Sequence, residues 1–261
     1  MARLFVVMAR EAPVAVILRR GPTKLWRVVR WETGQDQFQR GQWFRGSFYP
    51  ERCDLSPDGR LFLYFAGKSR VREFDSAYGG TWTAVSYAPY LTALALWPMG
   101  DCWGGGGAFL DNQTVVVDTS CFRPGLTHHP LHPPGPLQVL ERSALHFRDP
   151  RKTAKPAWQQ GWIDLPDESA IKRRADRVLR RHPRRRGYTL ERATGEELLP
   201  IPANWADWDH QGRLAATFGG RLQVLQEDQT WTELLNLDDD QFEPIEAPDW
   251  AKRWELQQPP R

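Results

Sequence analysis

The sequence has few cysteines and lacks a long apolar segment. It contains only three cysteines in 261 residues, and so small and odd a number excludes a disulfide framework. No run of about 18 apolar residues occurs, which excludes a transmembrane helix. The first apolar stretch, residues 4–9, is broken by Arg10 and Glu11, whereas a secretory signal needs about 7–15 apolar residues in a row. We therefore expect a cytoplasmic protein without membrane association.

Several motifs of catalytic and metal sites are also missing. There is no G-x-S-x-G nucleophile elbow, H-E-x-x-H or C-x2-C, and none of the three cysteines has a motif that marks a nucleophile. Four glycines follow Trp103, but the run lacks the Gly-Lys-Ser/Thr ending of a phosphate loop and continues into a strand-turn-strand pattern. These glycines favour a tight bend or a close backbone approach. The sequence thus indicates no cofactor and no catalytic residue.

A histidine group is the one pattern that suggests a metal. Cys121, His128, His129 and His132 are Zn²⁺-type ligands close together in the chain. Prolines at 130, 133 and 134 surround them, which indicates a loop, and loop histidines without a metal are the commoner case. We assign no metal ligand, and the question stays open at this point.

The composition is that of a folded β-rich chain. Hydrophobic residues make up 41%, aromatic residues 12% and charged residues 26%, with a formal net charge of +3. Turn glycines at 21, 59, 100, 135 and 212 are each near a short apolar run, and their spacing is close to 38 residues or twice that. A Pro/Asp/Gly turn before a short apolar strand, repeated about every 40 residues, is typical of one propeller blade.

Two segments carry a family resemblance. LSPDGRLFLYFAGKSRVREFD, from Leu55, resembles the strand-turn of TolB-like and WD40-like β-propeller repeats, and WDHQGRLAATFGGRLQVL, from Trp208, is a degenerate second copy. The resemblance implies a β-propeller, a fold used to bind proteins, peptides, sugars or metals. Residues 81–118 are also similar to a block in uncharacterised bacterial proteins. We predict a mostly β, propeller-like single domain over residues 1–261, with about six short blades; another barrel or sandwich is the alternative.

One segment has a helical pattern. Asp164 can cap a helix, Pro166 suits its first turn, and apolar residues recur at helical spacing up to Leu179. Pro183 would end it. We predict a basic helical insertion over residues 164–182, packed on the β body by Ile171, Ala175, Val178 and Leu179.

The strongest charge feature overlaps this segment. Residues 171–187 hold nine basic residues against one acid, and the tail from Glu227 to the end holds ten acids against three bases. The basic cluster could be solvated or pair with the acidic tail (about 227–261) in the same molecule, dock an acidic protein, or neutralise the phosphates of a nucleic acid. It lacks interleaved aromatic residues for base stacking, apart from Tyr188.

The sequence contains thirteen tryptophans, and some of them are candidates for a binding surface. Trp26, Trp31, Trp82, Trp97 and Trp208 lie in or beside predicted strands and indicate core, whereas tryptophans in NWADWD and in the tail are harder to bury together. Tryptophan is enriched at binding hot spots. The predicted partner-binding residues are Arg173, Arg177, Arg180, Arg181, Arg184, Arg185, Arg186, Trp205, Trp250 and Trp254.

We predict a non-enzymatic protein–protein interaction module or accessory subunit of a bacterial cytosolic complex, with an acidic protein as partner. One alternative is a nucleic-acid-associated accessory protein that uses residues 171–187. Another is a hydrolase or lyase with a central-channel site, for which Asp54 and Asp207, at equivalent positions of the two best segments, are the candidate acids. In propellers an acid at this position more often fixes a turn.

The cysteine count generates a prediction about redox state. With no signal sequence expected, Cys53, Cys102 and Cys121 should all be thiols in the cell. Rapid alkylation followed by denaturation and intact-mass measurement should find three labels per chain. A chain carrying only one label would contain a disulfide and would contradict the cytoplasmic assignment.

Overall fold

The computed structural model describes residues 2–68, 80–119, 125–143, 156–182 and 187–254. The chain is mostly β, with 50% of residues in strands and 5% helical. The described residues contain short 3-10 turns but no α-helix. None of their helical segments is long and apolar enough to cross a membrane.

Five sheets, which we call A to E, follow one another along the chain. Sheet A contains β1 (Arg3–Met8), β2 (Val14–Arg20), β3 (Leu25–Glu32) and β4 (Gln37–Arg45). Sheet B contains β5 (Ser47–Phe48), β6 (Asp54–Leu55), β7 (Leu61–Gly67), β8 (Thr81–Tyr87) and β9 (Ala95–Pro98). Sheet C contains β10 (Gly107–Phe109), β11 (Thr114–Thr119) and β12 (Gln138–Ser143).

Sheet D contains β13 (Ile163–Asp164), β14 (Ala170–Arg174), β15 (Arg177–His182), β16 (Gly187–Arg192) and β17 (Glu197–Ile201). Sheet E contains β18 (Trp205–Trp208), β19 (Leu214–Phe218), β20 (Arg221–Leu225) and β21 (Trp231–Asn236). The 3-10 turns are η1 (Pro22–Lys24), η2 (Pro50–Arg52), η4 (Ala157–Gln159) and η5 (Asp249–Lys252). All strand pairs are antiparallel except β11 with β12, which is parallel.

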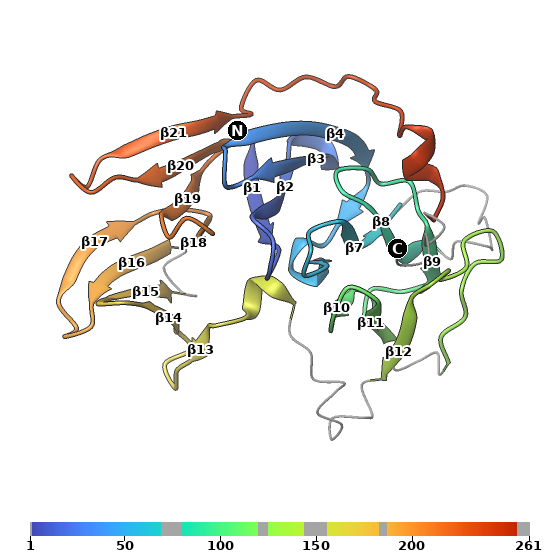
Figure 1. Cartoon of the computed structure of the whole chain (residues 1–261), viewed down its shortest axis with the longest axis horizontal. Coiled ribbons are helices and arrows are strands. Elements are labelled where there is room, and N and C mark those ends of the chain that lie inside the picture. Colours follow the sequence, from blue (N-terminus) through green and yellow to red (C-terminus); the bar gives the residue numbers. More distant parts are fainter. Residues whose placement is uncertain (1, 69–79, 120–124, 144–155, 183–186, 255–261) are drawn as a thin grey trace, which may run out of the picture.

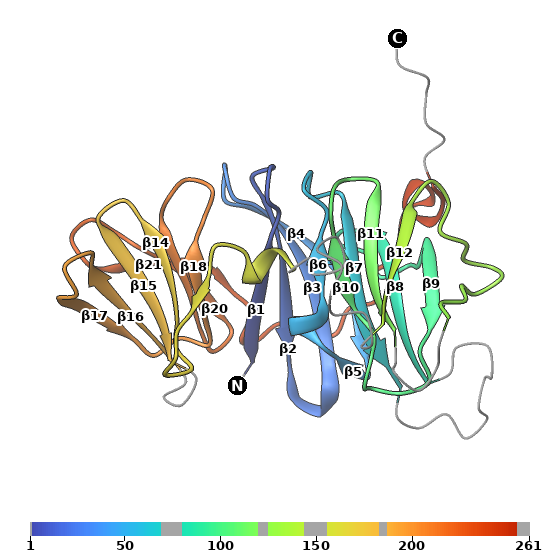
Figure 2. The ribbon, with the colours of Figure 1, turned by 90° about the horizontal axis from the view of Figure 1, so that it is seen from below.

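The sheets stand side by side and share four apolar cores (Figures 1 and 2). One core lies between sheets A and B, one between B and C, one between A and E, and one between D and E. Sheet A, in the middle, is therefore buried on both faces. This explains why β2 is a continuous apolar run: Val16 and Leu18 face sheet B, and Ala15 and Ile17 face sheet E.

Among the described residues, no apolar core joins sheets C and D. The five described sheets form neither a closed barrel nor a closed propeller. The mostly β prediction is confirmed. Five sheets are described where about six blades were expected.

The predicted helical insertion over residues 164–182 is wrong. The segment contains the end of β13 and the β14–β15 hairpin, in which Ile171 pairs with Arg180 and Arg173 with Val178. The signals taken for a helix start form a tight turn instead: the Asp167 carboxylate accepts the Ser169 backbone N–H at 3.0 Å, and Glu168 has a φ of 65°. Ile171, Val178 and Leu179 are buried as expected, whereas Ala175 is exposed at the hairpin turn.

The two segments that carry the resemblance occupy the same place in their sheets. The Ser56 N–H donates to the Leu61 carbonyl at 2.8 Å, and the Asp209 N–H donates to the Arg213 carbonyl at 2.9 Å. Gly59 and Gly212 close these turns with positive φ angles of 71° and 86°. Residues with a side chain rarely adopt this conformation. The other three spaced glycines lie elsewhere: Gly21 before η1, Gly100 after β9, and Gly135 in the connection to β12.

The segment after β21 crosses the outside of several sheets, and we call residues 237–254 the strap (Figure 1). The Arg19 side chain of β2 donates to the Leu237 carbonyl at 2.8 Å, and Gln42 of β4 donates to the Ile245 carbonyl at 3.2 Å. Ala247 and Ala251 are buried in the core between sheets B and C. The strap thereby connects sheet E to sheets A, B and C.

The described part of the acidic tail forms ion pairs with sheets A and E. Asp240 binds Arg27 at 2.8 Å and lies 3.7 Å from Arg40 of the same sheet, and Asp238 binds Arg221 at 3.2 Å. Among the described residues no ion pair joins the tail to residues 171–187. Arg27 is fully buried, and its guanidinium lies 4.9 Å from the Trp43 ring.

The buried Arg27–Asp240 pair generates a stability prediction. Asp240→Ala should lower the free energy of unfolding by about 3 kcal/mol, because it leaves a buried guanidinium without its counter-charge. Urea unfolding followed by tryptophan fluorescence would measure this loss. The exposed neighbour in Asp239→Ala is the matched control and should change stability by less than about 0.5 kcal/mol. A loss below about 1 kcal/mol in Asp240→Ala would mean that Arg27 reaches water.

Candidate functional site

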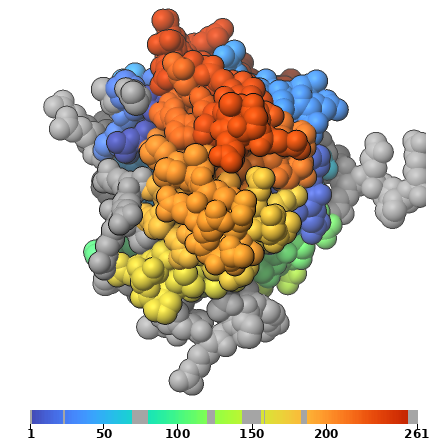
Figure 3. Space-filling model, turned by 90° about the vertical axis from the view of Figure 1, so that its left-hand side faces the viewer, coloured from blue at the N-terminus to red at the C-terminus, as the bar shows by residue number. Residues whose placement is uncertain are grey.

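The basic residues of sheet D fall into two groups. Arg173 and Arg177 are exposed at the tip of the β14–β15 hairpin. Sheet D, in yellow to orange, forms much of the face shown in Figure 3. Arg180 is committed to the sheet, because it binds Glu191 of β16 at 2.6 Å. The Arg181 guanidinium lies 5.1 Å from the ring of Trp162.

Arg184, Arg185 and Arg186 lie outside the described residues. On the described part of the hairpin, the exposed positive charge comes from Arg173, Arg174 and Arg177. None of these three side chains forms an ion pair among the described residues. Strand alternation places Lys172 and Arg174 on the face toward sheet E, since Lys172 reaches Asp207 at 2.8 Å and the Arg174 guanidinium lies beside Gly212.

A cavity of about 510 Å³ lies where the ends of β1, β14 and β18 meet, and we call it the hairpin cavity. Its charged and polar lining consists of Arg10, Gln160, Lys172, Arg173, Arg174, Asp207, Asp209 and His210. Both carboxylates are already neutralised, Asp207 by Lys172 and Asp209 by Arg213 at 2.7 Å. Arg10, Arg173 and Arg174 therefore give the cavity an excess of positive charge.

His210 fixes the wall of this cavity and is not a free acid–base group. Its Nε2 lies 2.8 Å from the Ala9 carbonyl and its Nδ1 lies 3.0 Å from the Thr33 hydroxyl. Nε2 must carry a proton to donate to the carbonyl, and both ring nitrogens are thus used in joining sheet E to sheet A.

The candidate acids are both buried, Asp54 on β6 of sheet B and Asp207 on β18 of sheet E. The Asp54 oxygens accept backbone N–H groups from Phe109 of sheet C at 2.7 Å and from Ala157 of η4 at 2.6 Å. Burial raises the pKa of Asp54 to about 7, against the opposing effect of these hydrogen bonds. Burial likewise raises the pKa of Asp207, although Lys172 opposes the shift. Both acids thus join neighbouring elements, whereas the structural alternative for them was the fixing of a turn.

The predicted tryptophans do not join the arginines in one surface. Trp205 is buried between sheets A and E and is not available to a partner, which corrects that assignment. Trp250 is 52% exposed and lies in η5, where its ring packs 5.6 Å from that of Tyr87. Trp254 lies close to Gly135. Both belong to the sheet B–C side, away from the hairpin (Figure 1). Trp26, Trp31, Trp97 and Trp208 are buried as expected, and Trp82 is half-buried.

The glycine run and the histidine group have structural roles in the described chain. A Cβ at Gly105 would collide with the Phe65 ring, and one at Gly106 would collide with the Arg52 carbonyl, so the run permits a close approach to sheet B. The rings of His129 and His132 pack at a tilt of 38° with centroids 5.4 Å apart, whereas Cys121 lies outside the described residues. In the described ranges, no three His, Cys, Asp or Glu side chains are placed to hold a metal ion. Cys53 is a buried thiol and Cys102 an exposed one.

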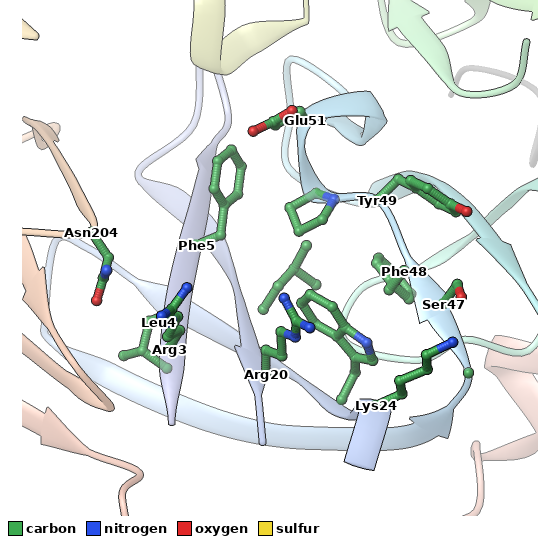
Figure 4. A pocket seen from close by; sticks show the side chains of 14 residues that line it. Arg3, Leu4, Phe5, Arg20, Lys24, Ser47, Phe48, Tyr49, Glu51 and Asn204 are labelled. Atoms are coloured by element: carbon green, nitrogen blue, oxygen red, sulfur yellow. The ribbon is translucent and has the colours of Figure 1, made fainter. Parts of the chain in front are cut away.

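A second cavity, of about 420 Å³, lies at the opposite end of β1, and we call it the rim cavity (Figure 4). Its charged lining consists of Arg3, Arg20, Lys24 and Glu51, and its aromatic lining consists of Phe5, Trp26, Phe48 and Tyr49. The sequence did not indicate this cavity or the hairpin cavity. Arg3, Arg10 and Arg20 lie in β1 and β2 or just after β1 with no motif around them, and only packing brings them to the cavities.

No protein-family model matches the chain, and no curated protein matches it either.

The raised pKa of Asp54 generates a pH prediction. The carboxyl group has a pKa near 4 in the unfolded chain and about 7 in the fold, so the folded state binds the proton more tightly. The stability that Asp54 contributes is therefore full below about pH 4 and is lost as the pH rises to about 7, by at most about 1.4 kcal/mol per pH unit.

Urea unfolding of the protein and of Asp54→Asn at pH 4.5, 5.5, 6.5 and 7.5 isolates this effect. The difference in unfolding free energy between the two should shrink as the pH rises. Asp239→Asn is the exposed control and should follow the parent protein at every pH. A difference that stays constant between pH 4.5 and 7.5 would contradict the buried, protonated state of Asp54.

Proposed function

We propose that this protein is a non-enzymatic binding module that docks an acidic protein partner on the β14–β15 hairpin and the adjoining hairpin cavity. The observation that carries the proposal is the display of Arg173, Arg174 and Arg177 without ion pairs among the described residues. Arg173 and Arg174 line a cavity whose own carboxylates are already paired, and Arg177 lies opposite Arg174 at the tip of the hairpin. Arginine forks of this kind suit bidentate binding of carboxylates.

The surroundings of the hairpin favour an acidic protein over a nucleic acid. Stacking of bases needs exposed rings beside the cations, but Trp162 is buried and covered by Arg181, and Tyr188 is only partly exposed. The whole chain carries a net charge of only +3. A local basic surface on a nearly neutral protein fits an electrostatically steered protein contact.

The engagement of the buried acids supports binding more than catalysis. Asp54 is held by backbone N–H groups of two elements, and Asp207 by Lys172. A general acid or base needs reach to a substrate. Asp54 is fully buried, and Asp207, which lines the hairpin cavity, is engaged by Lys172. Neither acid therefore supports the hydrolase or lyase alternative.

We also propose a propeller-like arrangement of the sheets and a cytosolic location. β1 and β6 both contact η4, while β1 also contacts β18 and β6 also contacts β10, as inner strands of neighbouring propeller blades would. We therefore propose an open, propeller-like arrangement. A cytosolic complex of a bacterial cell is the proposed setting, supported by the free thiols of Cys53 and Cys102.

The hairpin proposal can be tested with a defined acidic polymer. Fluorescently labelled poly-L-glutamate should bind the protein at low ionic strength, and Arg173→Ser/Arg177→Ser should weaken binding at least about fivefold. The melting temperature should change by less than about 2 °C, because exposed charges contribute little to folding. Arg180→Ser should instead lower it, since Glu191 loses its partner.

Arg253→Ser, which removes an exposed arginine of the strap, is the matched control and should bind poly-L-glutamate like the parent. Equal binding by the double variant would contradict the proposal. Tighter binding of a dT20 oligonucleotide than of poly-L-glutamate, lost in the same variant, would replace it with the nucleic-acid function.

A further inference from the structure

The rim cavity contains two arginines that face each other across a strand pair. In the register of β1 and β2, Arg3 is directly opposite Arg20. Both side chains are exposed and both line the cavity. Like charges directly opposite one another destabilise a sheet, and among the described residues neither arginine has an ion pair.

The rest of the charge around the cavity adds to this excess. Lys24, at the end of η1, also lines it, whereas Glu51 is its one acidic lining residue. Figure 4 shows Arg3, Arg20 and Lys24 along the lower margin of the cavity, and Phe5 and Glu51 at its upper margin. The basic groups are therefore gathered on one side of the opening.

The floor of the cavity is aromatic. Trp26 and Phe48 are 7% and 5% exposed, and their rings lie 5.6 Å apart. The Arg20 guanidinium lies 5.7 Å from the Trp26 ring, so one of the rim cations is held at the edge of the apolar floor. Ser47 and Asn204 provide uncharged polar groups in the lining.

A volume of about 420 Å³ is within the range of small-molecule sites, which combine an apolar lining with a few placed polar groups. An apolar ring fits the floor, and an anionic group fits the basic margin, where it would relieve the repulsion between Arg3 and Arg20. We propose that the rim cavity binds a small aromatic carboxylate, with the ring against Trp26, Phe48 and Phe5 and the carboxylate between Arg3 and Arg20.

This site is separate from the hairpin. The two cavities lie at opposite ends of β1, since Arg3, Leu4 and Phe5 line the rim cavity and Val6, Met8 and Arg10 line the hairpin cavity. The aromatic carboxylate can therefore be tested independently of an acidic partner.

Isothermal titration with 2-naphthoate at low ionic strength tests the proposal. 2-Naphthoate should bind with one site per chain, and the neutral 2-naphthamide should bind at least tenfold more weakly. Arg3→Gln and Arg20→Gln should each lose at least tenfold in affinity for 2-naphthoate. Without ligand, both variants should melt at the same or a higher temperature than the parent, because each removes the repulsion between the two arginines.

This combination separates a binding role from a structural one, since a structural arginine would lower the melting temperature when replaced. Arg253→Gln is the matched control and should bind like the parent. N-acetyltryptophan presents the same chemistry at a peptide end, and tighter binding of it than of 2-naphthoate would support the site and assign it to a chain terminus. Equal affinity for the acid and the amide, undiminished binding by both variants, or no binding of either acid would overturn the proposal.

Discussion

The carboxylate of Asp54 accepts backbone hydrogen bonds from sheet C and from η4 while buried away from water. η4 and β6 contact β1, and the Arg10 side chain, just after β1, donates to the Phe109 carbonyl of sheet C. An open row of sheets has no continuous hydrogen-bond ladder from one sheet to the next, so contacts of this kind must fix their relative positions. His210, which joins sheet E to Ala9 and Thr33, does the same on the other side of β1. Apolar packing provides most of the attraction, and these few polar contacts fix the angles.

Local patterning predicted the strands, because turn chemistry and apolar runs act over few residues. Gly59 and Gly212 mark their turns correctly, and the apolar segment after each is a buried strand. The spacing of the other glycines was misleading, because glycine also serves at loop positions such as Gly100 and Gly135. Residues 164–182 were misread because Ile171, Val178 and Leu179 fit a helical face and two paired strands equally well. What decided between them was the turn at Ala175, whose φ of 49° no helix contains.

The candidate sites were only partly predictable. The charge of the basic segment is visible in the sequence, but the division between displayed Arg173 and Arg177 and committed Arg180 depends on Glu191, which only the register of β15 and β16 places nearby. Pairing with the acidic tail was one of the alternatives for this segment, yet Asp240 and Asp238 of the tail pair with Arg27 and Arg221. The sequence shows which charged residues could attract one another, but the fold determines which ion pairs form. Basic side chains line both cavities, one at each end of β1. They come from segments far apart in the chain, so no local sequence pattern predicts that they lie together.

The packing of sheet A against sheet E has a consequence for biosynthesis. Sheet A leaves the ribosome well before sheet E, yet Leu4 and Val6 share a core with Leu222 and Val224. The hydrogen bond from Arg19 to Leu237 spans 218 residues of chain. Synthesis proceeds at about 5–20 residues per second, so one apolar face of the nascent sheet A lacks its native partner for many seconds. That interval is when the growing chain is most exposed to aggregation, and it is the stage at which a chaperone would engage it.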